Sequence, residues 1–314
     1  MVVLCQSVTK GMVIIMDSLY GKYLKEIPFT KGRPEPFECC ALMDKSFFGY
    51  DNCSVRLGIC GKEGPIIEEI DGMHVHDFDQ QLFFFSADLD DMLDLGAEIE
   101  LSLGEDGERH KFVIPTTVAI PKGTPHFPAV IKNLKKEFYY MSVSFSNEFK
   151  ATPVETTLTH NSSPLAGSRT QTRRLIMPMS FRNKSGYFYG AQYFQDSGGI
   201  FSVVDGSRSG LELTVSWESI GNAHTMGPPT PDGRHTPHVH KFDEVLFFLG
   251  TDSKNPEYIG CECELCYGKE IEPHTFNTAM ATIFPENLPH GPMTYQMPEK
   301  KLIFVVLSCA GAHH

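Results

Sequence analysis

Four residues in the second half of the sequence have the types and spacing of a metal site. His238, His240 and Glu244 follow one another at even intervals, and His290 comes about 50 residues later, behind a proline-containing turn. A strand places alternate residues on one face, so the first three can point the same way. Imidazole and carboxylate ligands suit first-row divalent metals. Three histidines and one glutamate leave coordination positions open, and the chemistry indicated is catalysis on a metal-bound ligand.

The first half of the sequence carries nearly the same set. His74, His76 and His126 have matching spacing, and the even-numbered position that corresponds to Glu244 is Gln80. An amide is neutral, so we expect this site to hold a metal less firmly, although an ion bound there would be a stronger Lewis acid. The alternative for either set is a barrel that has kept its histidines for packing.

Both histidine sets belong to an internal repeat of the sequence. Three blocks recur with one constant offset of 164 residues, which chance similarity would not preserve. We therefore expect two domains, an N-terminal barrel over residues 1–155 and a C-terminal barrel over 156–314, joined by a polar connection over 146–174. The matching blocks are 74–84 with 238–248 (eight of eleven positions identical), 98–104 with 262–268, and 121–126 with 285–290.

Short apolar, β-branched and aromatic runs separated by turn residues predict an all-β protein of the barrel or sandwich type. A helical turn is expected only at Leu89 to Leu95. The predicted strands include residues 82–85, 113–120, 138–145, 211–217, 245–249 and 302–307.

The pattern His-x-His-x-x-x-Glu followed by Pro-x-x-x-Pro-His resembles the two motifs of the cupin superfamily, and the tandem copy resembles a bicupin. The resemblance implies two jelly-roll β-barrels. It also implies that each histidine set, with Glu244 or Gln80, holds a metal ion. The superfamily includes dioxygenases, decarboxylases, isomerases, lyases, sugar binders and storage proteins, so the resemblance does not identify a reaction.

Other candidates are weaker. His224 and His235 precede the second histidine pair in a long loop, where either could act as an acid or base. Cys261, Cys263 and Cys266 resemble a metal cluster, but the repeat aligns them with ordinary strand positions, which favours a role in the core. Glutamates repeated at 98, 100, 262 and 264 are expected on a solvated strand face.

Composition limits the partners. The formal net charge of −12 over 314 residues argues against nucleic acid, which requires clustered Lys and Arg. The sequence contains no apolar stretch of membrane-spanning length and no signal-peptide pattern. Nine cysteines are then expected as reduced thiols in a cytoplasmic protein. Edge strands of such barrels make a homodimer an expectation.

The sequence thus predicts a metal-dependent enzyme acting on a small oxygen-rich molecule, with Fe, Mn, Zn or Ni in the second barrel and a further ion in the first. Dioxygenase or other oxidoreductase chemistry is preferred over isomerase or lyase chemistry. A non-catalytic ligand-binding or storage bicupin is the alternative from a different class.

Overall fold

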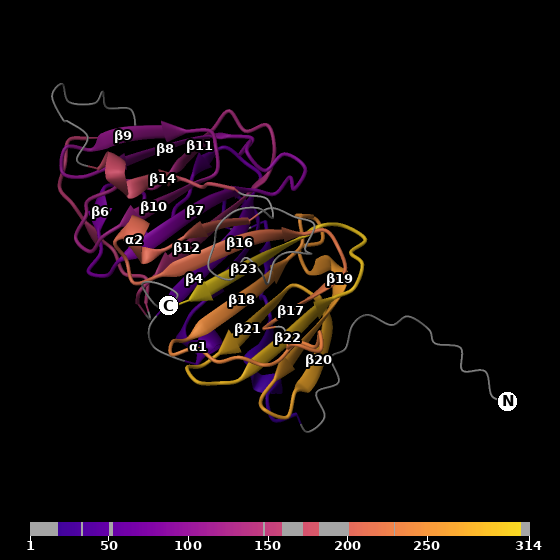
Figure 1. Ribbon diagram of the computed structural model, residues 1–314. Coiled ribbons are helices and arrows are strands. Elements are labelled where there is room, and N and C mark those ends of the chain that lie inside the picture. Colours follow the sequence, from indigo (N-terminus) through magenta and orange to yellow (C-terminus); the bar gives the residue numbers. More distant parts are fainter. Residues whose placement is uncertain are drawn as a thin grey trace.

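Two β-barrels lie side by side in the computed structural model (Figure 1). The prediction of an all-β protein is confirmed, because the described chain is almost entirely strand and turn. The structure describes residues 18–32, 34–49, 53–146, 148–158, 172–181, 201–228 and 230–308.

The first barrel is built from a large sheet that faces a smaller one. The large sheet has the order β14-β10-β7-β12-β4-β3-β2, the smaller has the order β5-β11-β8-β9, and a short pair joins β13 to β6. The strands are β2 (Thr30–Lys31), β3 (Phe37–Met43), β4 (Ser54–Cys60), β5 (Gly64–Pro65), β6 (His74–Val75), β7 (Gln80–Ser86), β8 (Glu98–Leu103), β9 (Glu108–Phe112), β10 (Thr116–Ile120), β11 (Val130–Lys132), β12 (Phe138–Ser144), β13 (Thr152–Pro153) and β14 (Ile176–Pro178).

The second barrel repeats this plan with a sheet in the order β1-β21-β18-β23-β16-β15 and another in the order β17-β22-β19-β20. Its strands are β1 (Leu24–Glu26), β15 (Phe201–Val204), β16 (Thr214–Ile220), β17 (His224–Met226), β18 (Glu244–Leu249), β19 (Tyr258–Tyr267), β20 (Glu272–Thr278), β21 (Met280–Phe284), β22 (His290–Tyr295) and β23 (Leu302–Ser308).

The duplication extends to the short helices α1 (Lys45–Phe48) and α2 (Gly206–Ser209). Asp44 and Asp205 cap them by accepting a hydrogen bond from the backbone N–H two residues on. Gly49 and Gly210 end them in the left-handed region, at φ of 85° and 74°. The repeat therefore also covers chain upstream of the histidine pairs, where the sequence alignment loses its register. Two further one-turn helices are η1 (Gly21–Tyr23) and η2 (Arg173–Leu175).

Most predicted strands are present, with two boundary corrections and one wrong element. The run 113–120 becomes a strand only from Thr116, because Pro115 has no N–H to donate and Val113 is 54% exposed. The run 211–217 begins at Thr214. The helical turn predicted at Leu89 to Leu95 is wrong, because residues 88–94 form turns whose aspartates converge on the Lys136 ammonium instead.

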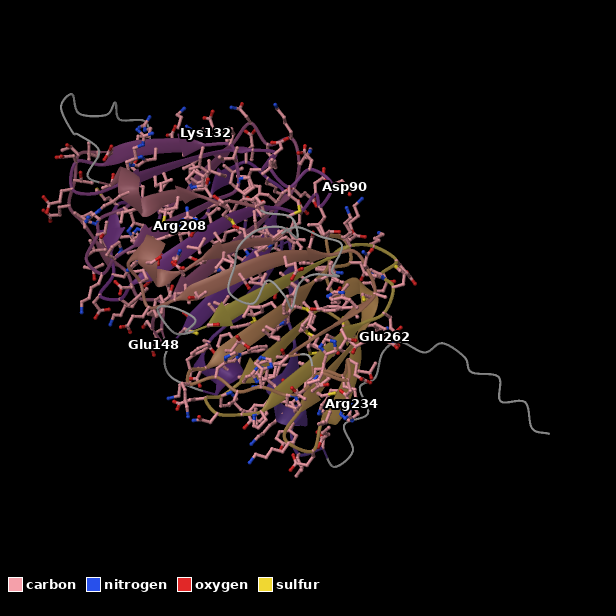
Figure 2. The ribbon with its side chains drawn as sticks, in the orientation of Figure 1. Asp90, Lys132, Glu148, Arg208, Arg234 and Glu262 are labelled. Carbon is pink, nitrogen blue, oxygen red and sulfur yellow. The ribbon has the colours of Figure 1, made fainter. Side chains whose placement is uncertain are left out.

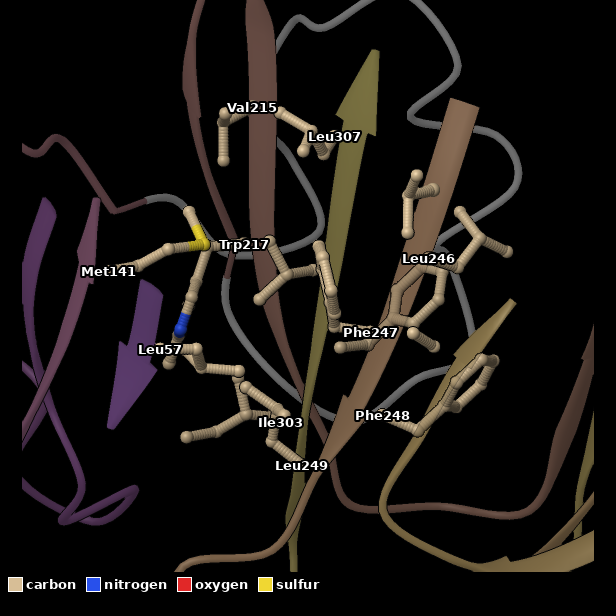
Figure 3. Packing of buried hydrophobic residues seen from close by; sticks show 14 of the residues in the cluster. Leu57, Met141, Val215, Trp217, Leu246, Phe247, Phe248, Leu249, Ile303 and Leu307 are labelled. Atoms are coloured by element: carbon tan, nitrogen blue, oxygen red, sulfur yellow. The ribbon is translucent and has the colours of Figure 1, made fainter. Parts of the chain in front are cut away.

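An apolar core joins the two barrels. Leu57 of β4 and Met141 of β12 lie beside Trp217 of β16 in Figure 3, and all three are at most 1% exposed. The Phe85 ring packs against Trp217 with 5.7 Å between centroids. Tyr139 Oη donates to the Gly250 carbonyl at 2.5 Å, a buried hydrogen bond between residues of the two halves. The odd-numbered residues of these strands thus face the other barrel, which leaves even-numbered ones such as Arg56 and Gln80 for the barrel interior.

Each barrel contains one strand that comes from the other half of the chain. β1 pairs antiparallel with β21 of the second barrel, with Leu24 opposite Thr282. β14 pairs antiparallel with β10 of the first barrel, with Met177 opposite Thr117. The division at residue 155 stays a prediction, and strand pairings cross it in both directions.

Many charged side chains lie on the outside of the molecule. Figure 2 shows Asp90 and Lys132 on the outside of the first barrel and Arg234 and Glu262 on that of the second. Within the described residues, no helix has the length and apolar character needed to cross a membrane.

Candidate metal centres

The first histidine set is assembled by pairing between two chain segments. His74 lies on β6 and His126 lies opposite it, where each backbone N–H donates to the other's carbonyl at 3.0 Å. Gln80 begins β7, and the His76 carbonyl accepts from the Gly123 N–H at 2.9 Å. All three histidines and Gln80 are at most 5% exposed. The chain bends between His76 and Gln80, so the set comes from two short strands and a turn instead of one continuous strand.

Backbone carbonyls fix the three imidazole rings of this set. The Nδ1 atoms of His74, His76 and His126 contact the carbonyl oxygens of residues Gly72, Phe78 and Thr124 at 2.7, 2.7 and 3.0 Å. A carbonyl can only accept, so Nδ1 carries the proton in each ring and the neutral imidazole keeps a lone pair on Nε2. This outer hydrogen bond is the one that orients metal-binding histidines.

Gln80 places a second lone pair against one of these rings. Its Oε1 lies 3.1 Å from His76 Nε2, while its Nε2 donates to Glu68 Oε2 at 2.6 Å and to Ser142 Oγ at 2.9 Å. The amide orientation follows from these partners, because the flipped amide would set its oxygen against the Glu68 carboxylate. Two acceptors, Gln80 Oε1 and His76 Nε2, therefore face each other. A cation between them would satisfy both.

A cavity of about 20 Å³ adjoins this set, which is room for about one water-sized group. Its polar lining consists of His74, His126, Gln80 and Glu68. The remaining wall is apolar or aromatic and is formed by Ile66, Leu82, Phe127, Pro128, Ala129 and Tyr140.

The second histidine set has the same backbone frame. His238 and His290 exchange N–H···O bonds of 2.9 and 3.0 Å, and the Asn287 N–H donates to the His240 carbonyl at 2.9 Å. One ring nitrogen from each of the three histidines lies within 4.8 Å of the others, so the cluster could hold a metal ion. Glu244, at the start of β18, brings Oε2 to 3.3 Å from His290 Nε2 and 3.6 Å from His240 Nε2.

Acceptors also converge in this second set. His290 Nδ1 donates to the Leu288 carbonyl at 2.9 Å, so its Nε2 carries the lone pair that faces the Glu244 carboxylate. Among the described residues, the buried His290 Nε2 and His238 Nδ1 have no hydrogen-bond partner. Ser308 Oγ donates to the other Glu244 oxygen at 3.3 Å and leaves Oε2 directed at the rings. These two atoms belong to one cluster, beside the buried Glu244 carboxylate.

Burial favours the neutral form of three of these rings, His74, His126 and His238, and the neutral form is the one that binds metals. Burial lowers the pKa of His74 and lowers that of His126 well below its usual value. Burial, together with the nearby His290 and His240 imidazoles, lowers the pKa of His238 to about 3. A lone pair is therefore available at neutral pH without loss of a proton.

Aromatic rings cover both sets. Phe78 stacks on His76 with centroids 4.3 Å apart, and Phe242 stacks on His240 at 4.8 Å. Phe149, on the segment after β12, contacts the His76 ring edge-on at 5.9 Å. These rings hold the imidazoles in place and exclude water from one side.

Asp79 and Asp243 point away from the histidines, as the alternation of the sequence predicts. Asp79 Oδ1 accepts from the Lys122 N–H at 2.7 Å, and Asp243 Oδ1 accepts from the Glu286 N–H at 2.8 Å. Each carboxylate thus fastens the turn that precedes the last histidine of its own barrel.

The two loop histidines lie outside the second cluster. His224 is on β17, stacked on Tyr295 with 4.8 Å between centroids, and His235 contacts the Gly227 carbonyl through Nδ1 at 2.8 Å. A catalytic role for either stays a prediction. Strand β19 carries three buried cysteines with free thiols, Cys261, Cys263 and Cys266, which agrees with the predicted role of these residues in the apolar core.

Sequence reasoning missed the groups that support the first set. Glu68, Ser142 and Arg56 come from three separate segments, and Arg56 Nε lies 3.4 Å from Glu68 Oε1. The repeat gave no signal for Glu68, because it precedes the histidine pair, where the two copies lose their register. The glutamates predicted on a solvated face are exposed at 262 and 264, but Glu100 is only 4% exposed and pairs with Arg109, Lys111 and Lys132.

Comparison with known proteins gives a match in structure alone. No protein-family model matches the sequence, and no curated protein matches it. Solved structures of oxalate decarboxylase resemble the chain, with 10% sequence identity over 93% of its length. They include the Bacillus subtilis enzyme at pH 4.6 (TM-score 0.56, 77% of that chain covered), a study of its Mn(II) centres (0.55, 78%) and a study of substrate binding and reaction specificity in oxalate decarboxylase (0.57, 78%). The fold of two tandem cupin-type jelly-roll barrels is thereby confirmed.

Proposed function

We propose that this protein is a metal-dependent enzyme acting on a small, oxygen-rich organic molecule. His238, His240, Glu244 and His290 would hold a divalent Fe, Mn, Zn or Ni ion in the second barrel. The histidine set at residues 74, 76 and 126, with Gln80, would hold another in the first. The observation that carries the proposal is the convergence of lone pairs, with imidazole nitrogens facing an amide or carboxylate oxygen inside each barrel.

A bound ion would act as a Lewis acid that polarises two oxygens of a chelating substrate. The protein's own groups prepare that position. Neutral imidazoles supply lone pairs, and Ser308 fixes the Glu244 carboxylate that lowers the local positive charge. Phe242 and Phe284, which stack on His240 and His290, keep the rings aligned.

For the reaction, we place carbon–carbon cleavage of a small carboxylic acid first. The resemblance in fold to oxalate decarboxylases supports it. Dioxygenase chemistry is the second candidate, because three histidines and a carboxylate with open positions also suit oxygen activation.

Elemental analysis of the purified protein tests the site. We expect one or two divalent ions per chain, and Glu244→Gln should lose the ion of the second barrel. Glu262→Gln, which changes an exposed carboxylate on β19, should retain it. A protein that is metal-free and also refuses added Mn²⁺, Fe²⁺ and Zn²⁺ would favour a non-catalytic binding barrel.

Two assays on the loaded protein then separate the reactions. Release of CO₂ from oxalate and related short carboxylic acids would support cleavage. Oxygen uptake with catechols or diketones, without that release, would support the dioxygenase.

A further inference from the structure

A carboxylate from outside the histidine motifs enters the first centre. Glu68 lies on the segment between β5 and β6, and its side chain is only 9% exposed. It lines the same small cavity as His74, His126 and Gln80. The first barrel therefore has a buried carboxylate beside its histidines, although its motif position holds an amide.

Two contacts hold this carboxylate in a fixed orientation. Oε2 accepts from Gln80 Nε2 at 2.6 Å, and Oε1 lies 3.4 Å from Arg56 Nε. The Arg56 side chain is itself only 12% exposed. A buried charge is costly unless it is paired, so Glu68 and Arg56 each depend on the other.

Glu68 also determines what Gln80 presents to the histidines. Because the amide N–H₂ group is drawn to Glu68 and Ser142, Oε1 is left facing His76 Nε2. In the second barrel the corresponding position is the Glu244 carboxylate itself. The pair Gln80–Glu68 thus occupies the place of one glutamate.

We propose that Glu68 supplies the negative charge of the first metal centre, where its carboxylate contacts Gln80 on one side and the Arg56 guanidinium on the other. This inference rests on the proposed function, since it assumes that the first histidine set binds a divalent ion. Without the Glu68 charge, the guanidinium and a metal ion held by the histidines would repel each other inside the barrel with no anion to compensate them. With Glu68, the first centre has a negative charge from another segment of the chain, although the neutral Gln80 stands at the motif position.

Titration of Mn²⁺ into the full-length, metal-stripped protein tests the inference. The background carries His238→Ala and His290→Ala, so that only the first centre is measured. Three further variants are compared in that background, Glu68→Gln, the exchange Glu68→Gln with Gln80→Glu, and the control Glu69→Gln. Glu69 is an exposed neighbour whose Oε2 accepts from the Ala151 N–H.

We expect Glu68→Gln to weaken Mn²⁺ binding by at least about 10-fold, the loss typical of removing a group that supports a metal site. The exchange variant should recover most of that loss, and Glu69→Gln should bind like the background protein. The thermal midpoint of the metal-free forms supplies a second readout. A purely structural role for Glu68 would lower that midpoint without changing the Mn²⁺ affinity of the protein that remains folded.

Unchanged Mn²⁺ affinity in Glu68→Gln would overturn the inference while leaving the metal centre in place. The inference would also be overturned if the exchange variant bound Mn²⁺ no more tightly than Glu68→Gln, because the loss of affinity would then come from damage to the cavity. If the background protein binds no Mn²⁺ while the wild type does, the first centre is no metal site and the inference falls. The proposed site of the second barrel survives that outcome, and it falls only if the wild type also binds none.

Discussion

At the scale of single residues, the two centres differ in how the side chain at the fourth motif position, Glu244 or Gln80, is oriented. Glu244 is directed by one serine hydroxyl, whereas Gln80 is directed by a carboxylate and a serine together. Small changes at these supporting groups should therefore act on one barrel at a time.

Ser308→Ala should weaken Mn²⁺ binding in the second barrel by about 10-fold, because the Glu244 carboxylate loses the donor that holds Oε1. Ser144→Ala changes the buried serine at the matching position of the first barrel and should leave that affinity unaltered. Mn²⁺ titration of each variant measures both effects. Equal losses from the two substitutions would show that Ser308 has no specific part in holding Glu244.

Glu100 should make folding sensitive to acid. Burial alone would raise its pKa, but hydrogen bonds from Lys132 and Lys111 and the charge of Arg109 outweigh burial and lower it below its ordinary value. A lowered pKa means that the ionised form stabilises the fold above the unfolded-state pKa of about 4.3, and that this contribution is lost as the pH falls through the folded-state value.

Glu100→Gln should therefore be less stable than the wild type at pH 7, with the difference shrinking below about pH 4.3. Urea unfolding at several pH values measures this. Glu98→Gln is the matched control, since Glu98 forms a single, more exposed ion pair with Lys111 and should change stability little. A constant gap between Glu100→Gln and wild type across pH 3 to 7 would contradict the prediction.

At the scale of elements, the turn before the last histidine of each barrel is fastened by an aspartate. Asp243→Ala should cost about 1.5 kcal/mol of unfolding free energy, the contribution of a hydrogen bond to a charged acceptor. It should also weaken metal binding in the second barrel only, because His290 follows that turn. Asp79→Ala should do the same for the first barrel, and Asp77→Ala, at an exposed position, should do neither. Denaturant unfolding and metal titration check these outcomes, and a loss in both barrels from one aspartate would refute the assignment.

Much of the arrangement of strands and candidate site residues could be predicted from the sequence. As the spacing and the repeat predict, the histidines lie near Glu244 in one barrel and near Gln80 in the other, because period-2 alternation and chain register are local properties. Glu68 could not be found that way, since it reaches Gln80 through a loop whose length differs between the copies. The helical turn at Leu89 to Leu95 failed for a similar reason, because Lys136, more than 40 residues later, gathers the aspartates of that segment.

At the scale of the whole molecule, the apolar contact around Trp217 and the exchanged strands β1 and β14 make the two halves interdependent. The fragments 1–155 and 156–314 should each aggregate when produced alone, because each exposes that contact and lacks one strand. Produced together they should form a soluble complex, which size-exclusion chromatography would detect. Two soluble, monomeric halves with cooperative unfolding would show that the contact is dispensable.

The position of β1 has a consequence for how the chain is made. Residues 24–26 are synthesised about 250 residues before their partner strand at residues 280–284, a delay on the order of tens of seconds at usual translation rates. The first barrel can close around β14 well before that. Leu24 and Ile27 must therefore wait without their partners while the second barrel is completed. Docking of β1 is thus a step that only a chain translated through residue 284 can take.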